Sequence, residues 1–238
     1  MSIFITLEGI DGSGKTTASK MLRDILSGDG YRVSLIKEPT GTLLGKFIIG
    51  EVLGASAGSG RRGAPFMKSL DKKTFAMAAT FLFSADRTVH IDEISAMSGG
   101  LDIIICDRFI DSTYAYQAAG LENSKKNEEL KEFILEINEF ILNQKEFSID
   151  RTYLFDLKPE TALGRLKGRT NKYDGFDSLP ADFFNSVRDN YLYLSQRYKN
   201  RIKTVCASGT PESTAAEIAG DIETLLNYNE SGQKPKSS

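Results

Sequence analysis

The sequence predicts an α/β fold, in which a five-stranded parallel sheet has helices on both faces. Apolar runs of strand length alternate with helical segments along the chain, the pattern of parallel strands joined by crossover helices. A glycine-rich loop joins the first run directly to the first helix. Polar stretches follow the first three predicted strands, at the end of the sheet where such folds bind ligands.

The first predicted strand and helix flank a phosphate-binding loop. Residues 3–7 form a β-branched and aromatic run typical of a buried strand, and residues 17–26 have apolar side chains at helical spacing. The loop between them has the spacing of a P-loop and contains the candidate ATP-binding residues Gly9, Ile10, Asp11, Gly12, Ser13, Gly14, Lys15, Thr16 and Thr17. The sequence therefore predicts a P-loop NTPase fold, and a glycine-rich turn without a ligand is the alternative.

The residue types of this loop suit a nucleoside triphosphate. Glycines allow successive backbone N–H groups to converge on phosphate oxygens at the start of a helix. Lys15 adds a positive charge for the β- and γ-phosphates, and the Thr16 hydroxyl is placed to bind Mg²⁺.

The remaining elements continue the alternation. We expect strands at 31–37, 101–106, 153–157 and 202–206, and helices at 45–53, 73–90, 128–142, from Pro159, at 183–198 and at 211–228. Proline in the first turn marks the helices that begin at Pro159 and Pro211. Residues 54–63 are low in complexity and predict a mobile loop, and residues 164–177 form a basic mobile segment between helices.

Length and composition limit the domain organisation and the partners. No linker divides the 238 residues, so we expect one domain at 1–228 and a disordered tail at 229–238, which lacks apolar residues. A formal net charge of -2 argues against a nucleic-acid partner. No long apolar stretch or basic leader is present, so we expect no membrane span and a cytoplasmic location. Cys106 and Cys206 each end an apolar run, and we expect both to be reduced core residues.

A second group of candidate site residues follows the third predicted strand. Asp107 and Arg108 would place a carboxylate near the Mg²⁺ ion and a guanidinium near the phosphates. A surface ion pair is the alternative for this dipeptide. The following residues, 112–117, mix hydroxyls, an amide and aromatic rings, as a site for a small polar ring requires.

One short segment matches the guanine-binding motif of P-loop GTPases. Residues 171–174 spell Asn-Lys-x-Asp, but a basic segment precedes them where GTPases have an apolar strand. No Asp-x-x-Gly follows the middle strand. A GTP-binding switch protein therefore stays a remote alternative.

Four segments together resemble the thymidylate kinase family of P-loop nucleoside monophosphate kinases. Residues 8–17 fit Glu-Gly-x-Asp-Gly-x-Gly-Lys-Thr-Thr, and residues 37–42 stand where the family has Arg-Glu-Pro-x-Gly-Thr. Residues 83–90 fit Phe-x-x-Asp-Arg-x-x-His, and residues 107–117 are close to Asp-Arg-Tyr/Phe-x-x-Ser-x-x-Ala-Tyr-Gln. The resemblance extends from Ile3 to about Leu226.

This resemblance implies a set of site residues. The substrate-binding residues would be Glu38, Pro39, Phe83, Arg87, Arg108, Ser112, Thr113, Tyr116 and Gln117, and the metal site would use Thr16, Asp107 and Glu8. Phe83 would stack on thymine, Arg87 would bond its O4 edge and Thr113 its N3 side. Tyr116 would crowd the position of a ribose 2′-OH.

The resemblance also implies a lid at about 165–177. The P-loop contains no arginine, so the chain resembles bacterial-type members that supply the phosphate-bridging arginine from the lid. Arg169 is the first candidate, and Arg165, nearer the preceding helix, is the second. With Lys15, Arg108 and Asp11, these complete the candidate catalytic residues, where Asp11 would orient the acceptor phosphate or metal waters.

The implied reaction transfers the γ-phosphoryl of ATP, with Mg²⁺, to dTMP, and yields ADP and dTDP for dTTP biosynthesis. A kinase for another pyrimidine monophosphate or for a deoxynucleoside is the nearest alternative, because a thymine methyl supplies only about 1–3 kcal/mol of discrimination. The family also implies a homodimer, with the apolar helix at 73–83 as its candidate interface.

Overall fold

The computed structural model describes residues 2–52, 70–121, 124–167 and 181–230. In chain order its elements are β1 (Ile3–Glu8), α1 (Lys15–Gly28), β2 (Val33–Lys37), α2 (Leu43–Phe47), the π-helical turn η1 (Ile48–Val52), α4 (Lys72–Ser98), β3 (Ile103–Asp107), α5 (Ile110–Gln117), α6 (Lys125–Gln144), β4 (Arg151–Asp156), α7 (Pro159–Lys167), α8 (Ala181–Arg197), β5 (Ile202–Cys206) and α9 (Pro211–Glu230). None of the helices in these ranges is long and apolar enough to span a membrane.

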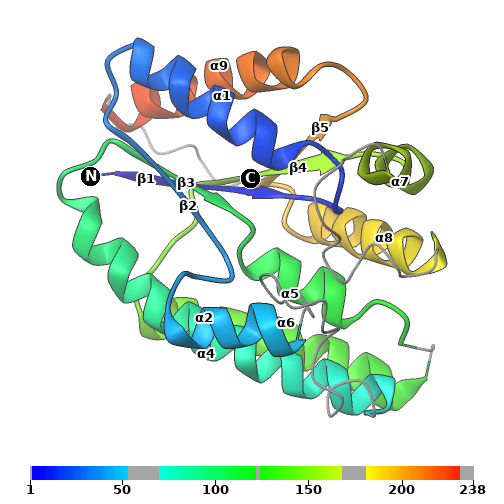
Figure 1. Cartoon of the computed structure of the whole chain (residues 1–238). Coiled ribbons are helices and arrows are strands. Elements are labelled where there is room, and N and C mark those ends of the chain that lie inside the picture. The colour runs from blue at the N-terminus through cyan, green and yellow to red at the C-terminus, as the bar shows by residue number, and fades with distance from the viewer. Residues whose placement is uncertain (1, 53–69, 122–123, 168–180, 231–238) are drawn as a thin grey trace.

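The five strands form one parallel sheet in the order β2-β3-β1-β4-β5. Helices α1 and α9 cover one face, and α4, α5 and α6 lie on the other (Figure 1). This arrangement confirms the predicted α/β fold with helices on both faces. Because β1 is central, the loop that follows it lies at the middle of the sheet edge, where side chains from β3, β4 and α8 can meet it.

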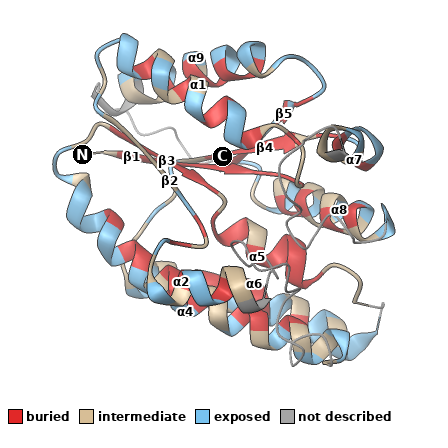
Figure 2. Cartoon of the chain, viewed as in Figure 1, coloured by how far each residue is buried: buried red, intermediate tan, exposed pale blue. Residues whose placement is uncertain are grey.

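Strand alternation divides the core between the two faces. In β1, Ile5 and Leu7 belong to the cluster that contains Leu22 of α1, whereas Phe4 packs in the cluster with Ile91 of α4. Successive side chains of a strand point to opposite faces, so β1 must be apolar on both sides. Figure 2 accordingly shows buried residues along the strands and on the inward sides of the helices.

Several predicted boundaries differ from the structure. The helix expected at 73–90 continues to Ser98, and the helix expected at 45–53 is α2 followed by a π-helical turn. Residues 112–117, interpreted only as a polar site, belong to helix α5, which begins at Ile110. Residues 164–167 belong to α7, so the predicted basic segment begins inside a helix. Its remainder, including Arg169 and residues 171–174, lies outside the described residues, as does the loop predicted at 54–63.

Two expectations near the C-terminus are wrong in detail. Cys206 is exposed, although Cys106 is buried as expected. The reason is that β5 is an edge strand, in which Ile202 and Val205 are buried whereas Thr204 and Cys206 are exposed. Helix α9 continues to Glu230, past the predicted start of the tail at residue 229, and residues 231–238 lie outside the description.

Candidate active site

The backbone of the P-loop requires glycine at two close approaches. Gly9 and Gly12 have φ of 140° and 82°, in the region that favours glycine. A Cβ atom on Gly9 would lie 2.7 Å from the carbonyl oxygen of Phe155, and one on Gly12 would lie 2.5 Å from that of Ala162. The loop is therefore pressed against the end of β4 and against α7, which fixes its shape.

Lys15 is folded into this loop. Its Nζ atom donates to the carbonyl oxygens of Gly9 at 2.8 Å and Ile10 at 2.9 Å, and lies 3.3 Å from the hydroxyl of Ser13. Burial, followed by the charge of Arg108, lowers the pKa of Lys15 to about 8, although nearby carboxylates oppose this shift. The ammonium group is thus held at the centre of the loop by neutral oxygens.

An oxygen pair lies at the start of α1. The Thr16 hydroxyl donates to Asp107 Oδ2 at 2.7 Å, and Asp107 is the last residue of β3, in register with Leu7 of β1. Within the described ranges no group of three or more His, Cys, Asp or Glu side chains could hold a metal alone. A hydroxyl with a single carboxylate suits Mg²⁺, which keeps waters and shares its coordination with substrate phosphates.

Arg108 connects the P-loop to helix α5. Its Nη2 atom donates to Asp11 Oδ1 at 2.6 Å and to the Tyr116 hydroxyl at 3.2 Å. The guanidinium also lies 5.0 Å from the centre of the Tyr116 ring. The Tyr116 hydroxyl in turn donates to Asp11 Oδ2 at 2.7 Å. Burial tends to raise the pKa of Asp11, but Arg108 and Lys15 lower it below its usual value, so Asp11 is ionised.

A second network surrounds Arg87 on α4. The Arg87 side chain is only 1% exposed, and its Nε and Nη2 atoms donate to Glu38 Oε2 at 3.1 and 2.7 Å. Nη2 also donates to the Thr113 hydroxyl at 2.9 Å, and Nη1 donates to Asn138 Oδ1 at 3.1 Å. Arg87 and Thr113 are adjacent, as expected for a shared base site, but the guanidinium contacts protein groups. Phe83 is half-buried one turn earlier on α4.

Residues that sequence reasoning missed complete this network. Asp86 accepts from the backbone N–H of Thr40 at 2.9 Å and from its hydroxyl at 2.7 Å, which fixes the loop after β2. His90 Nδ1 lies 3.1 Å from Glu38 Oε1. Asp86 and His90 belong to the motif at 83–90, so their place in that motif could have identified them as site residues. Asn138 is on a distant helix and had none.

Glu8, which was expected in the metal site, accepts hydrogen bonds from four protein groups. Its Oε1 atom accepts from the backbone N–H groups of Phe109 at 2.7 Å and Ser112 at 3.2 Å. Its Oε2 atom accepts from the hydroxyls of Ser112 at 2.6 Å and Tyr191 at 2.9 Å. These four donors come from the loop after β3, from α5 and from α8. Both oxygens of Glu8 are therefore engaged by protein donors.

Arg165 lies closer to the P-loop than the sequence suggested. Its Nη2 atom donates to the carbonyl oxygen of Ala207 at 3.1 Å, and Nη1 lies 3.5 Å from that of Ser13. The sequence indicated only that Arg165 lies nearer the preceding helix than Arg169, because residue spacing does not show which turn of α7 faces the loop. Arg169 lies outside the described residues.

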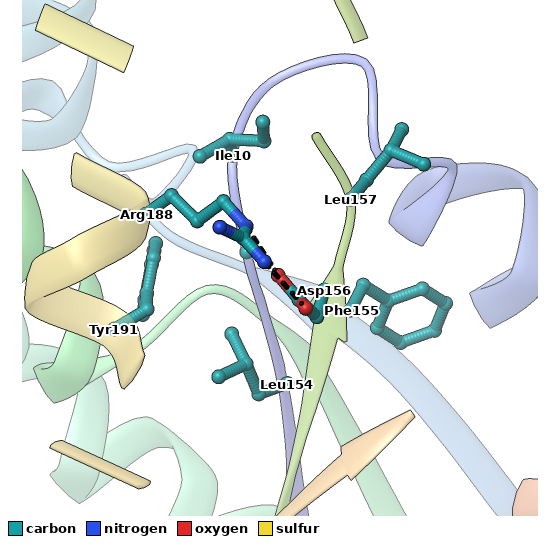
Figure 3. Close-up of a pocket in the computed structure, with 8 residues that line it drawn as sticks. Ile10, Leu154, Phe155, Asp156, Leu157, Arg188 and Tyr191 are labelled. Carbon is teal, nitrogen blue, oxygen red and sulfur yellow. Dashed lines mark hydrogen bonds and ion pairs between the residues drawn. The ribbon is translucent and has the colours of Figure 1, made fainter. Parts of the chain in front are cut away.

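A small pocket adjoins Gly9 and Ile10 (Figure 3). Arg188 reaches from α8 to Asp156 at the end of β4, with Nε to Oδ1 at 2.6 Å and Nη2 to Oδ2 at 2.9 Å. A two-pronged pair of this kind fixes orientation as well as distance. It secures α8 to the sheet beside the P-loop, and the same helix presents Tyr191 to Glu8.

The site therefore has two halves joined by Arg108. One half has a glycine-rich loop, a lysine and an oxygen pair, the groups that a nucleoside triphosphate site requires. The other is a polar network on α4 and α5 that faces the same edge of the sheet. Fold and site together define a P-loop nucleotide kinase, in which the second half would receive the acceptor.

Comparisons with known proteins specify the family. The family model for thymidylate kinase matches residues 7–218. A thymidylate kinase of Exiguobacterium sibiricum is 33% identical over 229 residues, which cover 95% of this chain and 97% of the relative. That of Desulforapulum autotrophicum is 36% identical over 235 residues, covering 95% and 93%. That of Bifidobacterium longum subsp. infantis is 34% identical over 229 residues, covering 95% and 88%. The chain belongs to the thymidylate kinase family and is an enzyme of that family.

Proposed function

We propose that this chain transfers the γ-phosphoryl of MgATP to the 5′-phosphate of dTMP and releases ADP and dTDP. Membership of the thymidylate kinase family supports this reaction over a kinase for another acceptor and over a GTP-binding switch. The structural observation that carries it is the position of Arg108, which contacts Asp11 of the P-loop and Tyr116 of α5 at the same time. A single cation thus borders both the donor half and the acceptor half.

On the donor side, the chain supplies a preformed cradle. Backbone N–H groups of residues 12–16 bind the phosphates, and Lys15 exchanges the carbonyls of Gly9 and Ile10 for β- and γ-phosphate oxygens. Thr16 and Asp107 would hold Mg²⁺, since their side-chain oxygens lie 2.7 Å apart. The ion would supply positive charge for the phosphates of the donor.

On the acceptor side, α4 and α5 bind dTMP. Phe83 provides a ring face for thymine, and Arg87 with Thr113 provides a donor and an acceptor for its edge. Tyr116, held by Asp11, occupies the space of a ribose 2′-OH. The loop at Glu38 and Pro39, Ser112 and Gln117 complete the acceptor half.

The transfer step itself needs cations more than a base. The acceptor phosphate is already ionised near neutral pH, so no strong base is required. Asp11 is paired with Arg108 and Tyr116, which suits a role in orientation rather than proton removal. Lys15, Arg108 and an arginine of the lid neutralise the transferring group. Arg165 already lies at the P-loop, and Arg169 remains the lid candidate for the closed state.

Side-by-side turnover with four acceptors tests the proposal. ATP is supplied with dTMP, dUMP, dCMP or thymidine, and ADP release is followed with a coupled assay. We expect the highest kcat/KM with dTMP, with dUMP lower by about 10- to 200-fold for one methyl group. Preference for dCMP or thymidine would select the alternative kinases. Tight GTP binding without turnover of dTMP would select a switch protein.

We further propose that the enzyme is a homodimer that pairs through α4 and α6. Exposed apolar side chains lie on these two helices: Met77 (39%), Phe81 (50%), Val89 (50%), Phe133 (37%) and Phe140 (61%). The rings of Phe81 and Phe133 are 5.9 Å apart, so the two helices share one apolar surface. A second copy of the same surface would cover it, as in two-fold dimers. A single domain at 1–228 and a cytoplasmic location stay predictions.

A further inference from the structure

The carboxylate of Glu8 is fully buried, lies beside the active site and has no part in the chemistry described so far. We propose that Glu8 is a positioning residue, which holds Arg108 in the backbone conformation that directs its guanidinium to the P-loop. It acts through Arg108 and binds no metal. The proposal rests on the dTMP kinase activity proposed above.

The backbone of Arg108 needs outside support. Its φ is 71°, in the left-handed region, which is costly for a residue with a side chain. Both neighbouring peptide groups are tied to the end of β1. The N–H of Arg108 donates to the carbonyl oxygen of Leu7 at 3.0 Å, and the N–H of Phe109 donates to Glu8 Oε1 at 2.7 Å. Glu8 thus fixes the peptide group that follows the strained residue.

Glu8 also anchors the helix that continues from this loop. Phe109, at the N-cap of α5, makes no side-chain capping bond. The Glu8 carboxylate satisfies the N–H of Phe109 and that of Ser112, and its negative charge lies at the positive end of the helix. Strand β1 therefore fixes where α5 begins, and α5 carries the acceptor residues Thr113 and Tyr116.

The side chain of Arg108 is positioned through a bridge to the same carboxylate. The Ser112 hydroxyl donates to Glu8 Oε2 at 2.6 Å, so its lone pairs face Arg108 Nη1 at 3.2 Å. The Tyr191 hydroxyl lies 2.9 Å from Glu8 Oε2 and 3.3 Å from Arg108 Nη1. Two neutral hydroxyls thus relay the position of Glu8 to the guanidinium, which then meets Asp11.

The Glu8→Gln variant, assayed at pH 8, tests this role. Glutamine has the same shape, but its amide nitrogen cannot accept the bonds made to Oε2. We expect kcat to fall by about 10- to 100-fold, the effect of losing hydrogen bonds to one charged group. The Mg²⁺ concentration for half-maximal rate should stay unchanged, whereas Asp107→Asn should raise it. A shifted Mg²⁺ dependence in Glu8→Gln, or an unchanged kcat, would overturn the proposal.

A double-mutant cycle separates positioning from general destabilisation. If Glu8 acts through Arg108, then Glu8→Gln should change kcat little in an Arg108→Ala background. Full additivity of the two effects would overturn the proposal. Asp150→Asn is the matched control, because Asp150 also accepts from a backbone N–H of β1, that of Phe4 at 2.7 Å, at the other end of the strand. It should alter stability without altering kcat.

The Arg108→Gly variant provides a second test, based on Tm, in case Glu8→Gln folds too poorly for kinetic measurements. Glycine adopts φ of 71° without steric cost, so Arg108→Gly should need less support from Glu8. We expect Glu8→Gln to lower Tm less in the Arg108→Gly background than in the wild-type background. An equal loss of Tm in both backgrounds would contradict the backbone argument. Wild-type turnover of dTMP is measured first, so failure of the proposed function is recognised independently of these variants.

Discussion

Substitution of Arg165 and of Arg169 by alanine should change different kinetic parameters. Arg165 already contacts the carbonyl oxygens of Ala207 at 3.1 Å and Ser13 at 3.5 Å, the second near the limit of a hydrogen bond. Its bonds in the free enzyme are therefore worth at most about 1 kcal/mol, and Arg165→Ala should barely change Tm. With ATP bound, the same guanidinium would face phosphate oxygens. A charge-assisted bond of about 1.5–3 kcal/mol corresponds to roughly 10- to 150-fold in affinity.

We therefore expect Arg165→Ala to raise the KM for ATP by about 10- to 150-fold with a smaller change in kcat. For Arg169→Ala we expect a kcat lower by about 10³-fold or more with little change in ATP affinity, as for an arginine that arrives on closure. Steady-state kinetics and separate ATP-binding measurements on both variants decide between these patterns. Arg197→Ala, which removes an ion pair between α8 and Glu132 of α6, is the matched control. A kcat defect larger in Arg165→Ala than in Arg169→Ala would refute the assignment.

Four further predictions concern the rest of the site and the surface. Lys15→Ala should fold normally, by circular dichroism, and lose about 10²- to 10³-fold in kcat, because one preorganised cation is removed; near wild-type turnover would exclude the role. The ribose form of TMP should be a poor acceptor, and Tyr116→Ala should bring the kcat/KM values for the deoxy and ribo acceptors closer together. Equal kcat/KM values for the two acceptors in the wild type would exclude Tyr116 from the sugar site. Phe81→Glu should convert the dimer to monomers in sedimentation experiments, and a wild-type monomer would refute the interface. Burial and the charge of Asp111 raise the pKa of Glu8 from 4.5 to about 7. The folded state therefore favours protonated Glu8, and the free energy of unfolding falls by about 3 kcal/mol as the pH rises from 4.5 to 7. Over this range the Tm of Glu8→Gln should fall less than the Tm of the wild type.

The sequence predicted the features that local residue patterns determine. The P-loop depends on glycines and a lysine at fixed spacing, and β1 and α1 flank it as apolar runs of the correct periods. The parallel sheet follows from the alternation of strands and helices. The strand ends supplied Asp107 and Arg108 because ligand-binding residues gather there. Each of these features can be recognised from residues that are close to one another in the chain.

Contacts between distant segments were not predictable in the same way. Tyr191 meets Glu8 across 183 positions of the chain, and nothing near Tyr191 in the sequence marks that contact. Glu8 accepts from the backbone N–H groups of Phe109 and Ser112, 101 and 104 positions along the chain, and no pattern in the sequence marks these contacts. The contact between Arg165 and Ser13 was likewise not predictable, because the phase of α7 relative to the loop is set by packing. Cys206 was read as buried because the position of β5 at the sheet edge is a property of the whole topology.

The charges that meet at the P-loop support our proposal that the lid supplies part of the cation set. Arg108 is shared between Asp11, which it contacts directly, and Glu8, which it contacts through Ser112. Lys15 is surrounded by the same carboxylates and by Asp107, which raise its pKa against the effects of burial and of Arg108. The two central cations are thus already offset by carboxylates of the protein before a nucleotide binds. ATP and dTMP add several more negative charges, which Mg²⁺ neutralises only in part. We propose that further guanidinium groups come from outside the sheet edge, and Arg165 of α7, whose Nη1 atom lies 3.5 Å from the carbonyl oxygen of Ser13, is one candidate.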